Sequence, residues 1–300
     1  MHKNPNNPTR LNFSLRWSAM THPGRVRPNN EDSFLALTFD GREMQRLGRI
    51  GDTTVETSDC IFAVSDGMGG AKSGEFASSL VVDGITRLLP KGFRLRAAGL
   101  SRGFNDLLDE LISEIHDNLT RMGAFYEECQ GMGATLSLCW FTPEWMFFGH
   151  IGDSRIYYLP RDGSIKQLTH DDTHVGWLFR KGEISEREAR THPRRSALQQ
   201  ALGASTQFIE PQIGAVGLQT GDRFFICSDG LVDGLWDRHI EEYLTASGHG
   251  PIDSNLADQM VLTAVENSGK DNTTAMVIEV DVAPNAAPGG PASAPGQNDP

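Results

Sequence analysis

The sequence predicts an α+β fold: a central β-sandwich of two mainly antiparallel sheets, flanked by α-helices on both faces in an α-β-β-α arrangement. Three observations support this prediction. Strand-like runs occupy much of the chain, short turn-like links join several of them, and the fewer helical patterns are amphipathic. No long linker rich in Pro, Gly or Ser divides residues 11–282, so a single domain is expected there.

The strand patterns begin at the start of this domain. The run FSLRWSA has apolar side chains at every second position, the period of a half-buried strand: Phe13, Leu15, Trp17 and Ala19. Seven further runs follow, in the order SFLALTF, CIFAVS, ATLSLCWF, WMFFGHI, RIYYLP, RFFICS and TAMVIEV. The links FTPEW and YLPRDGSI have the composition of hairpin turns, which indicates antiparallel neighbours.

Helical spacing of apolar residues occurs in four segments: 74–89, 94–122, 237–245 and 254–267. The link at residues 40–59 is unusually long for two neighbouring strands. It is interpreted either as a mobile hairpin near a functional site or as a decoration of the fold, and we favour the second interpretation.

The composition excludes several classes of partner. The net charge of −12 argues against binding to nucleic acid or to anionic membranes, both of which favour a basic surface. No window is apolar enough to span a membrane, the first dozen residues lack a signal-peptide core, and the four cysteines show no paired spacing, so a cytoplasmic location is expected. The Asn/Pro-rich residues 1–10 and the Pro/Ala/Gly-rich residues 283–300 are predicted to be disordered.

Several aspartates stand at the ends of apolar strands, where an unpaired carboxylate is costly to bury. Asp66, Asp153 and Asp229 each follow such a run. Asp32 begins the strand before the one that Asp66 ends, so antiparallel pairing would place the two side by side. Asp271 precedes the strand TAMVIEV, and the same argument brings it next to Asp229.

A cluster of five carboxylates predicts a site for hard divalent cations, because Mg²⁺ and Mn²⁺ prefer oxygen ligands. Its charge is too large for one ion, which favours two ions sharing a bridging aspartate and holding a hydroxide between them. Glycines after Asp66 would let the backbone approach the ions. A single Asp-Gly pair is usually only a turn, and the repetition argues against that interpretation here. Neither glycine-rich nucleotide-loop pattern fits residues 66–75.

Six motifs, GRVRPNNED, VSDGMGG, GMGATLSL, HIGDSRIYYL, CSDGL and GKDNTT, occur in this order between residues 13 and 281. Together they resemble the metal-dependent PPM-type (type 2C) protein serine/threonine phosphatases, in particular their stand-alone bacterial branch. The resemblance implies a hydrolase acting on phosphoserine and phosphothreonine in proteins by direct attack of the hydroxide between two Mn²⁺ or Mg²⁺ ions. It also implies a role in signal transduction opposite a Hanks-type serine/threonine kinase, and a flap at about residues 170–204 beside the metal site.

The resemblance further assigns roles to individual residues. Asp66 is expected to bridge both ions, with the Gly67 carbonyl on one of them. Asp229 and Asp271 would bind the other ion, Asp32 would contribute through water with Glu31 beside it, and Asp153 with Asp229 would complete a third, weaker site. Arg27 matches the arginine that binds the substrate phosphate, for which a guanidinium fork is suited. His150, Asn272 and Glu31 are candidates for supporting these ligands, and a purely structural role is an equal alternative for His150.

Two features bear on the expected mechanism. Met68 stands where many eukaryotic relatives carry a histidine proposed as the general acid. In the flap, the histidines His174 and His192 and the arginines Arg190, Arg194 and Arg195 are expected to lie on a solvated face rather than to contact substrate. Two alternative functions stay open: hydrolysis of small phosphoesters, and a non-catalytic phosphatase-like binding module, against which the retention of all five aspartates argues.

Overall fold

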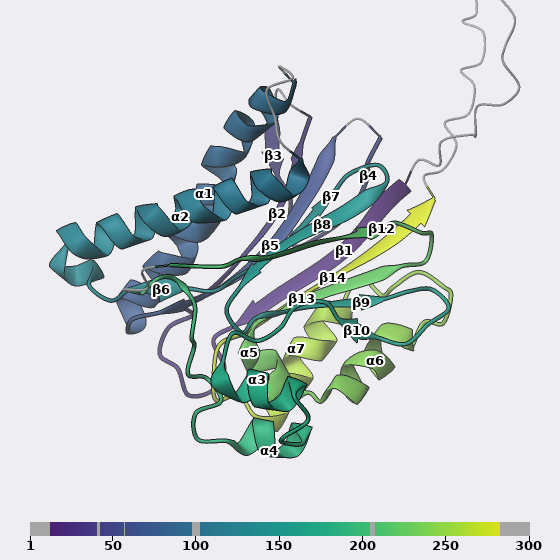
Figure 1. Ribbon diagram of the computed structural model, residues 1–300. Helices are drawn as coiled ribbons and strands as arrows, with labels where there is room; N and C mark the ends of the chain where they lie inside the picture. Colours follow the sequence, from purple (N-terminus) through teal and green to yellow (C-terminus); the bar gives the residue numbers. More distant parts are fainter. Residues whose placement is uncertain (1–12, 41–42, 57, 98–102, 205–207, 283–300) are drawn as a thin grey trace, which may run out of the picture.

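The computed structural model describes residues 13–40, 43–56, 58–97, 103–204 and 208–282. Two antiparallel sheets pack face to face in it, with helices on both outer sides (Figure 1), which confirms the predicted sandwich. The predicted disordered segments, residues 1–10 and 283–300, lie outside the described residues.

The first sheet contains the first and last strands of the described chain. Its six strands run in the order β10 (Lys166–Gln167), β9 (Arg155–Leu159), β13 (Arg223–Cys227), β14 (Thr273–Val282), β1 (Phe13–His22) and β4 (Ile50–Thr54). The strands β1 and β14 pair along their full length, from Phe13 opposite Val282 to His22 opposite Thr273. Segments more than 250 residues apart in the sequence are thereby fixed next to each other.

The second sheet has eight strands. Six of them follow the order β11 (Leu202–Gly203), β6 (Gly133–Ala134), β5 (Asp59–Met68), β7 (Leu136–Phe141), β8 (Trp145–Ile151) and β12 (Gln212–Gly217). In addition, β2 (Asp32–Phe39) pairs with β5, and β3 (Met44–Arg46) pairs with β2. The alternating residues of β1 that the sequence predicts to be buried face this sheet: Phe13, Leu15, Trp17 and Ala19 belong to the apolar core between the sheets.

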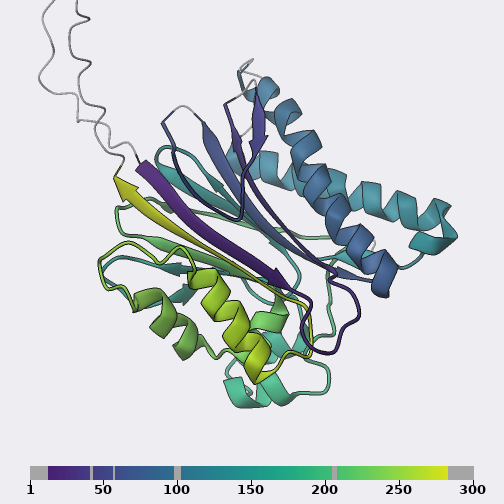
Figure 2. The same ribbon diagram turned by 180° about the vertical axis from the view of Figure 1, so that it is seen from behind.

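Helices cover each outer face, as Figures 1 and 2 show from opposite sides. The helices α1 (Ala71–Ala97) and α2 (Phe104–Phe125), followed by the short 3₁₀ turn η1 (Glu127–Cys129), pack on the second sheet. The helices α5 (Asp229–Gly234), α6 (Asp237–Thr245) and α7 (Leu256–Asn267) pack on the first. Within the described ranges, no helix has the length and apolar character needed to cross a membrane.

The predicted helix at residues 94–122 is wrong at its beginning. Residues 94–97 belong to the end of α1, and α2 begins only after Gly103, which has an extended backbone with φ −63° and ψ 175°. The apolar stripe that marks α2 starts at Phe104 and includes the buried residues Leu108 and Ile112. Before this stripe the sequence has Gly99 and Gly103, and glycine is unfavourable inside a helix.

The long link at residues 40–59 joins the two sheets. Its strand β3 extends the second sheet beside β2, while β4 pairs with the first half of β1, from Ser14 to Ser18. Trp17 Nε1 donates a hydrogen bond of 2.9 Å to the Gly48 carbonyl between these strands. In its described part the link adds an edge strand to each sheet and leaves β2 at the end away from Asp32 and Asp66. The alternative of a hairpin near the site is therefore wrong, and the favoured interpretation as a decoration of the fold agrees with these edge positions.

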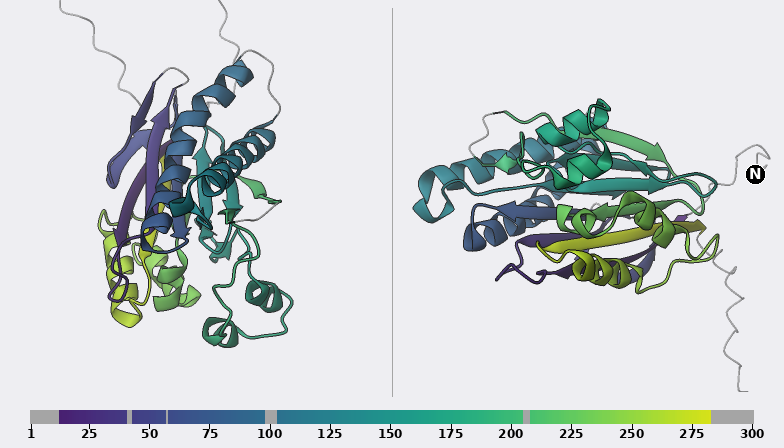
Figure 3. Two further views of the ribbon diagram at one scale, coloured as in Figure 1. Left: turned by 90° about the vertical axis from the view of Figure 1, so that its left-hand side faces the viewer. Right: turned by 90° about the horizontal axis from the view of Figure 1, so that it is seen from below.

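Residues 170–204, called the flap below, project beyond the end of the strands (Figure 3). They contain the short helices α3 (His174–Arg180) and α4 (Glu186–Thr191), which the periodicity of the sequence did not predict. A β-bridge between Thr173 and Leu198 closes the base of this segment. The flap then re-enters the second sheet through β11.

Candidate metal centre

The strand-end aspartates lie at one end of the sandwich. Asp32, the first residue of β2, is the direct partner of Asp66 in β5, as predicted from the strand order. Asp229 follows β13 and Asp271 precedes the adjacent strand β14, and Ser228 N donates 3.1 Å to the Thr274 carbonyl between them. The sheets therefore bring carboxylates from both halves of the sandwich to a common rim.

A pocket of about 300 Å³ lies at this rim. Of the residues predicted for the site, those that line it are Arg27, Glu31, Asp66, Gly67, Asp153, Asp229 and Asp271. Asp32, His150 and Asn272 are not among the lining residues and are buried. The predicted set thus separates into groups that face the pocket and groups that lie behind it.

The carboxylates repel one another and are poorly hydrated. Burial raises the pKa of Asp66 well above its usual value, and the charges of Asp32, Asp229, Asp153 and Asp271 raise it further. Burial also raises the pKa of Asp229, again with added repulsion from Asp153 and Asp271. The pKa of Asp153 rises to about 7, mainly through burial. Such a cluster requires positive charge to remain ionised at neutral pH.

The donor set fits hard divalent cations. Two buried oxygens, Asp32 Oδ1 and Asp229 Oδ1, have no hydrogen-bond partner among the described residues. A Cβ atom at Gly67 would overlap the carbonyl of Gly74, so only glycine fits where the backbone enters the rim. Within the described ranges, no three Asp, Glu, His or Cys side chains alone form a cage for one ion. Mg²⁺ or Mn²⁺ would therefore take further oxygens from water and from carbonyls such as that of Gly67.

Arg27 extends over the same pocket. Its Nη2 lies 2.7 Å from Asp271 Oδ2, and about half of its side chain is exposed. Arg25, the other arginine of the motif, instead donates to the carbonyls of Glu266 and Ser268 at the end of α7. Of the two arginines in this motif, Arg27 is therefore the one whose guanidinium an anion in the pocket would contact.

Asn272 holds the loop that carries Arg27 and Glu31. It is buried, its Oδ1 accepts a 2.8 Å hydrogen bond from Glu31 N, and its Nδ2 donates to the carbonyls of Pro23 and Asn29. Burial raises the pKa of the Glu31 carboxyl, which lines the pocket. Asn272 therefore supports the site through the backbone.

His150 supports the turn that precedes Asp153. It is fully buried, with Nδ1 2.9 Å from Ser137 Oγ and Nε2 3.1 Å from the Gly152 carbonyl. Burial lowers its pKa to about 4, so the imidazole is neutral. A neutral ring can donate from one nitrogen and accept at the other, which matches this pair of contacts.

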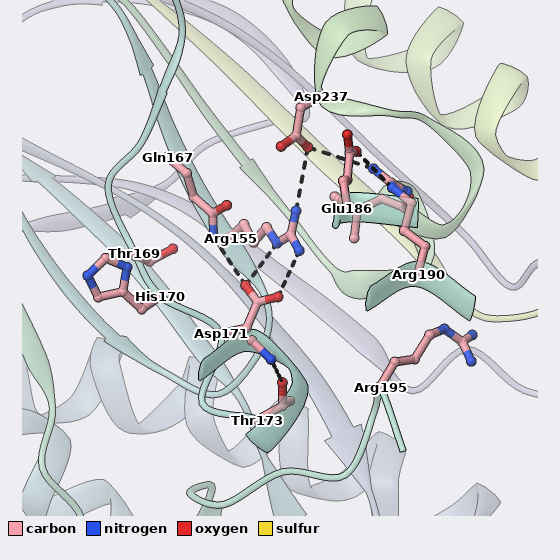
Figure 4. A network of polar contacts seen from close by, with 12 residues as sticks. Arg155, Gln167, Thr169, His170, Asp171, Thr173, Glu186, Arg190, Arg195 and Asp237 are labelled. Atoms are coloured by element: carbon pink, nitrogen blue, oxygen red, sulfur yellow. Dashed lines mark hydrogen bonds and ion pairs between the residues drawn. The ribbon is translucent and has the colours of Figure 1, made fainter. Parts of the chain in front are cut away.

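The base of the flap contacts residues just before and just after Asp153 in the sequence, namely Gly152 and Arg155. Asp171 makes a bidentate pair with Arg155 at 2.8 and 2.7 Å, and Figure 4 shows this arginine between Asp171 and Asp237. Asp172 accepts a 2.9 Å hydrogen bond from Gly152 N, and its own N donates to the Gly152 carbonyl. Movement of the flap base would therefore disturb the turn that carries Asp153.

Two flap arginines contact α5, the helix that Asp229 begins. Arg195 forms a bidentate pair with Asp233 at 3.1 and 2.5 Å. Arg190 donates to the carbonyls of Val232 and Leu235 and lies over the ring of Trp236. The prediction of a solvated face is wrong for these two arginines, because α5 offers them carbonyl and carboxylate acceptors.

The remaining predicted surface residues of the flap behave as expected. Arg194 is exposed, and its backbone N donates a hydrogen bond to Nδ1 of His192, a half-buried residue that caps the end of α4. His174 is exposed and stacks on Trp177. Neither histidine lines the pocket that contains the carboxylates.

Comparison with known proteins decides the family. Residues 50–261 match the sequence pattern of a family described as protein phosphatase 2C. The chain belongs to this family. The resemblance inferred from the six motifs is thereby confirmed.

Among phosphatase 2C relatives, serine/threonine protein phosphatase PstP of Mycobacterium tuberculosis is 33% identical over 277 residues, which cover 90% of this chain and 46% of PstP. The chain therefore spans about half the length of PstP. Serine/threonine phosphatase stp of Listeria innocua is 31% identical over 260 residues, covering 86% of this chain and 93% of that protein.

Solved structures of phosphatase 2C proteins give the same picture. The M. tuberculosis PstP/Ppp crystal structure superposes with a TM-score of 0.70 at 30% identity, covering 89% of this chain and 99% of that one. The PstP catalytic domain in complex with two manganese ions has a TM-score of 0.68 at 30% identity, over 90% of this chain and 99% of that one.

Sequence reasoning missed several residues that shape this phosphatase 2C site. Thr135 Oγ1 accepts the Asp66 amide at 3.0 Å, and Ser65 Oγ donates to the Thr135 carbonyl at 2.7 Å. Ser228 and Thr274 both donate to Asp32 Oδ2. All four lie inside the quoted motifs VSDGMGG, GMGATLSL, CSDGL and GKDNTT. For Ser65 and Ser228 the available signal was a hydroxyl residue immediately before a motif aspartate, and Thr135 and Thr274 have no such neighbour.

Proposed function

We propose that this chain is a protein serine/threonine phosphatase that hydrolyses phosphoserine and phosphothreonine with two Mn²⁺ or Mg²⁺ ions held at the rim. The observation that carries the proposal is the pocket in which four buried or half-buried aspartates meet Arg27, with unpaired carboxylate oxygens beside it. Membership of the phosphatase 2C family and the two manganese ions of PstP support it.

The proposed ligands follow from the geometry and the resemblance together. Asp66 and the Gly67 carbonyl would hold ions at the centre of the rim, and Asp229 and Asp271 would complete the set on the side of the first sheet. Asp153 with Asp229 would form a third, weaker site, and Asp32 with Glu31 would act through water. When bound, such ions activate a water molecule for attack on phosphorus and offset the charge of the transferring group.

Arg27 orients the substrate phosphate in this proposal, and the cysteines do not support a thiol-based mechanism. Arg27 would exchange its contact with Asp271 for two oxygens of the substrate phosphate, an interaction that guanidinium geometry favours. All four cysteines are buried and none lines the pocket, so no thiol is placed to act there as a nucleophile.

Protonation of the leaving alkoxide is assigned to solvent. Met68 lines the pocket at the position where many eukaryotic relatives carry a histidine, and no histidine is among the described residues that line it. The pocket is bordered by Ser196 and Leu198 of the flap, where a peptide segment around the phosphoresidue would lie. We also propose that the substrates are phosphorylated proteins and that a cognate serine/threonine kinase acts in opposition to the phosphatase. The same proposal places the protein in signalling in the cytoplasm.

Hydrolysis assays distinguish the proposal from its alternatives. The chain is incubated with a phosphothreonine peptide and with p-nitrophenyl phosphate in Mn²⁺, and each reaction is repeated with EDTA. Hydrolysis of the peptide that EDTA abolishes is expected. Hydrolysis of the small ester without the peptide would favour a small-molecule phosphohydrolase, and hydrolysis of neither would favour a binding module.

A further inference from the structure

A group of buried hydroxyls lies behind Asp32 and contacts only one of its two carboxylate oxygens. Thr274 Oγ1 donates to Asp32 Oδ2 at 2.6 Å, and Ser228 Oγ donates to the same oxygen at 2.8 Å. Both hydroxyl residues are fully buried. Asp32 Oδ1, in contrast, has no hydrogen-bond partner among the described residues. The two oxygens of one carboxylate thus have opposite environments.

The proton of each hydroxyl can be assigned by counting donors, because a hydroxyl carries a single proton. Thr274 gives its proton to Asp32, so in its 2.7 Å contact with Thr21 Oγ1 the donor must be Thr21. Thr21 Oγ1 in turn accepts a 2.8 Å hydrogen bond from Asn30 Nδ2. Ser228 Oγ accepts from Thr274 N at 3.0 Å and keeps its proton for Asp32.

The hydroxyls come from separate elements of the fold. Thr21 is on β1, Thr274 is on the neighbouring strand β14, and Ser228 immediately precedes α5. Asn30 also holds the Asp32 amide through its Oδ1, at 3.2 Å. Rotation of the Asp32 carboxylate would break two hydrogen bonds to a charged acceptor, which are stronger than those between neutral groups.

We propose that Thr274 and Ser228, with Thr21 acting through Thr274, are positioning residues for Asp32: they hold Oδ2 and leave Oδ1 directed to the cation shell of the rim. This inference rests on the proposed function only in one respect, which is that Asp32 faces bound divalent cations. The hydroxyls touch neither the pocket nor a substrate, so their effect on the reaction is exerted through the orientation of one carboxylate.

The inference is tested by titrating Mn²⁺ into the full chain by isothermal calorimetry, with phosphothreonine-peptide hydrolysis measured in parallel. Thr274→Val replaces the hydroxyl by a methyl group of similar shape and is expected to weaken Mn²⁺ binding by about tenfold. Thr274→Ser keeps the hydroxyl and should bind as the wild type does. Ser228→Ala should resemble Thr274→Val, and Thr21→Val should have a smaller effect because Thr274 keeps its proton donor role.

Thr142→Val is the matched control. Thr142 is also buried, and its Oγ1 donates to the Trp145 carbonyl at 3.0 Å in the turn between β7 and β8, at the end of the sandwich opposite Asp66. It should lose stability like any buried hydroxyl deletion and leave Mn²⁺ affinity unchanged. Circular dichroism establishes that each variant is folded, and if Thr274→Val is not, the pair Ser228→Ala and Ser228→Thr carries the same comparison.

Wild-type affinity in Thr274→Val and Ser228→Ala, or equal weakening in Thr274→Ser and Thr274→Val, would overturn the inference. A wild type that binds Mn²⁺ but hydrolyses no phosphopeptide would instead contradict the proposed function, and the affinities of the variants would still test the role of the hydroxyls.

Discussion

His150 should make the fold sensitive to acid. Burial lowers its pKa from 6.5 to about 4, and the nearby charge of Asp171 opposes this only in part. Above pH 6.5 the imidazole is neutral in both the folded and the unfolded chain. As the pH falls towards 4, only the unfolded chain takes up the proton, so the free energy of unfolding decreases. The gap between the two pKa values corresponds to roughly 3 kcal/mol, at about 1.4 kcal/mol per pH unit.

Urea unfolding of the wild type and of His150→Gln, both in EDTA, measures this contribution. Glutamine is polar and does not titrate, so the difference in unfolding free energy between the two proteins isolates the imidazole from the clustered carboxylates. As the pH is lowered from 6.5 to 5, we expect the free energy of unfolding of the wild type to fall by about 2 kcal/mol relative to that of His150→Gln. Parallel pH profiles for the two proteins would refute the reasoning, because they would mean that His150 gains a proton equally in both states.

Three further perturbations test the rim and the flap. Asp229→Asn should abolish Mn²⁺-dependent hydrolysis and yet stabilise the metal-free chain against urea, because it removes a buried charge repelled by its neighbours; normal turnover would exclude Asp229 as a ligand. Arg27→Ala should raise KM for a phosphothreonine peptide by about tenfold with a smaller change in kcat, and an unaltered KM would place the phosphate contact elsewhere. Asp171→Ala leaves Arg155 without its bidentate partner and should lower the free energy of unfolding by about 3 kcal/mol in urea; a loss below about 0.5 kcal/mol would show that solvent replaces the pair.

The sequence alone determined the sandwich and the meeting of its aspartates. Period-2 burial in β1 and the apolar runs that end at Asp66 and Asp229 are local signals, because side chains alternate across a strand and a carboxylate stands out after a buried run. Short links elsewhere in the chain indicated mainly antiparallel neighbours. If the strands of Asp32 and Asp66 also pair antiparallel, across the long link at residues 40–59, the two aspartates lie side by side, and the register of β2 and β5 confirms this.

Only the tertiary structure decided which groups surround those aspartates. The donors on Asp32 come from positions 196 and 242 residues away in the chain, and the flap arginines find their acceptors on α5 some 40 residues later. The link at residues 40–59 is likewise explained only by the sheets that it joins. Such contacts depend on strand order, register and the docking of helices on the sheets, and these arise from the packing of the whole chain rather than from any local pattern of residues.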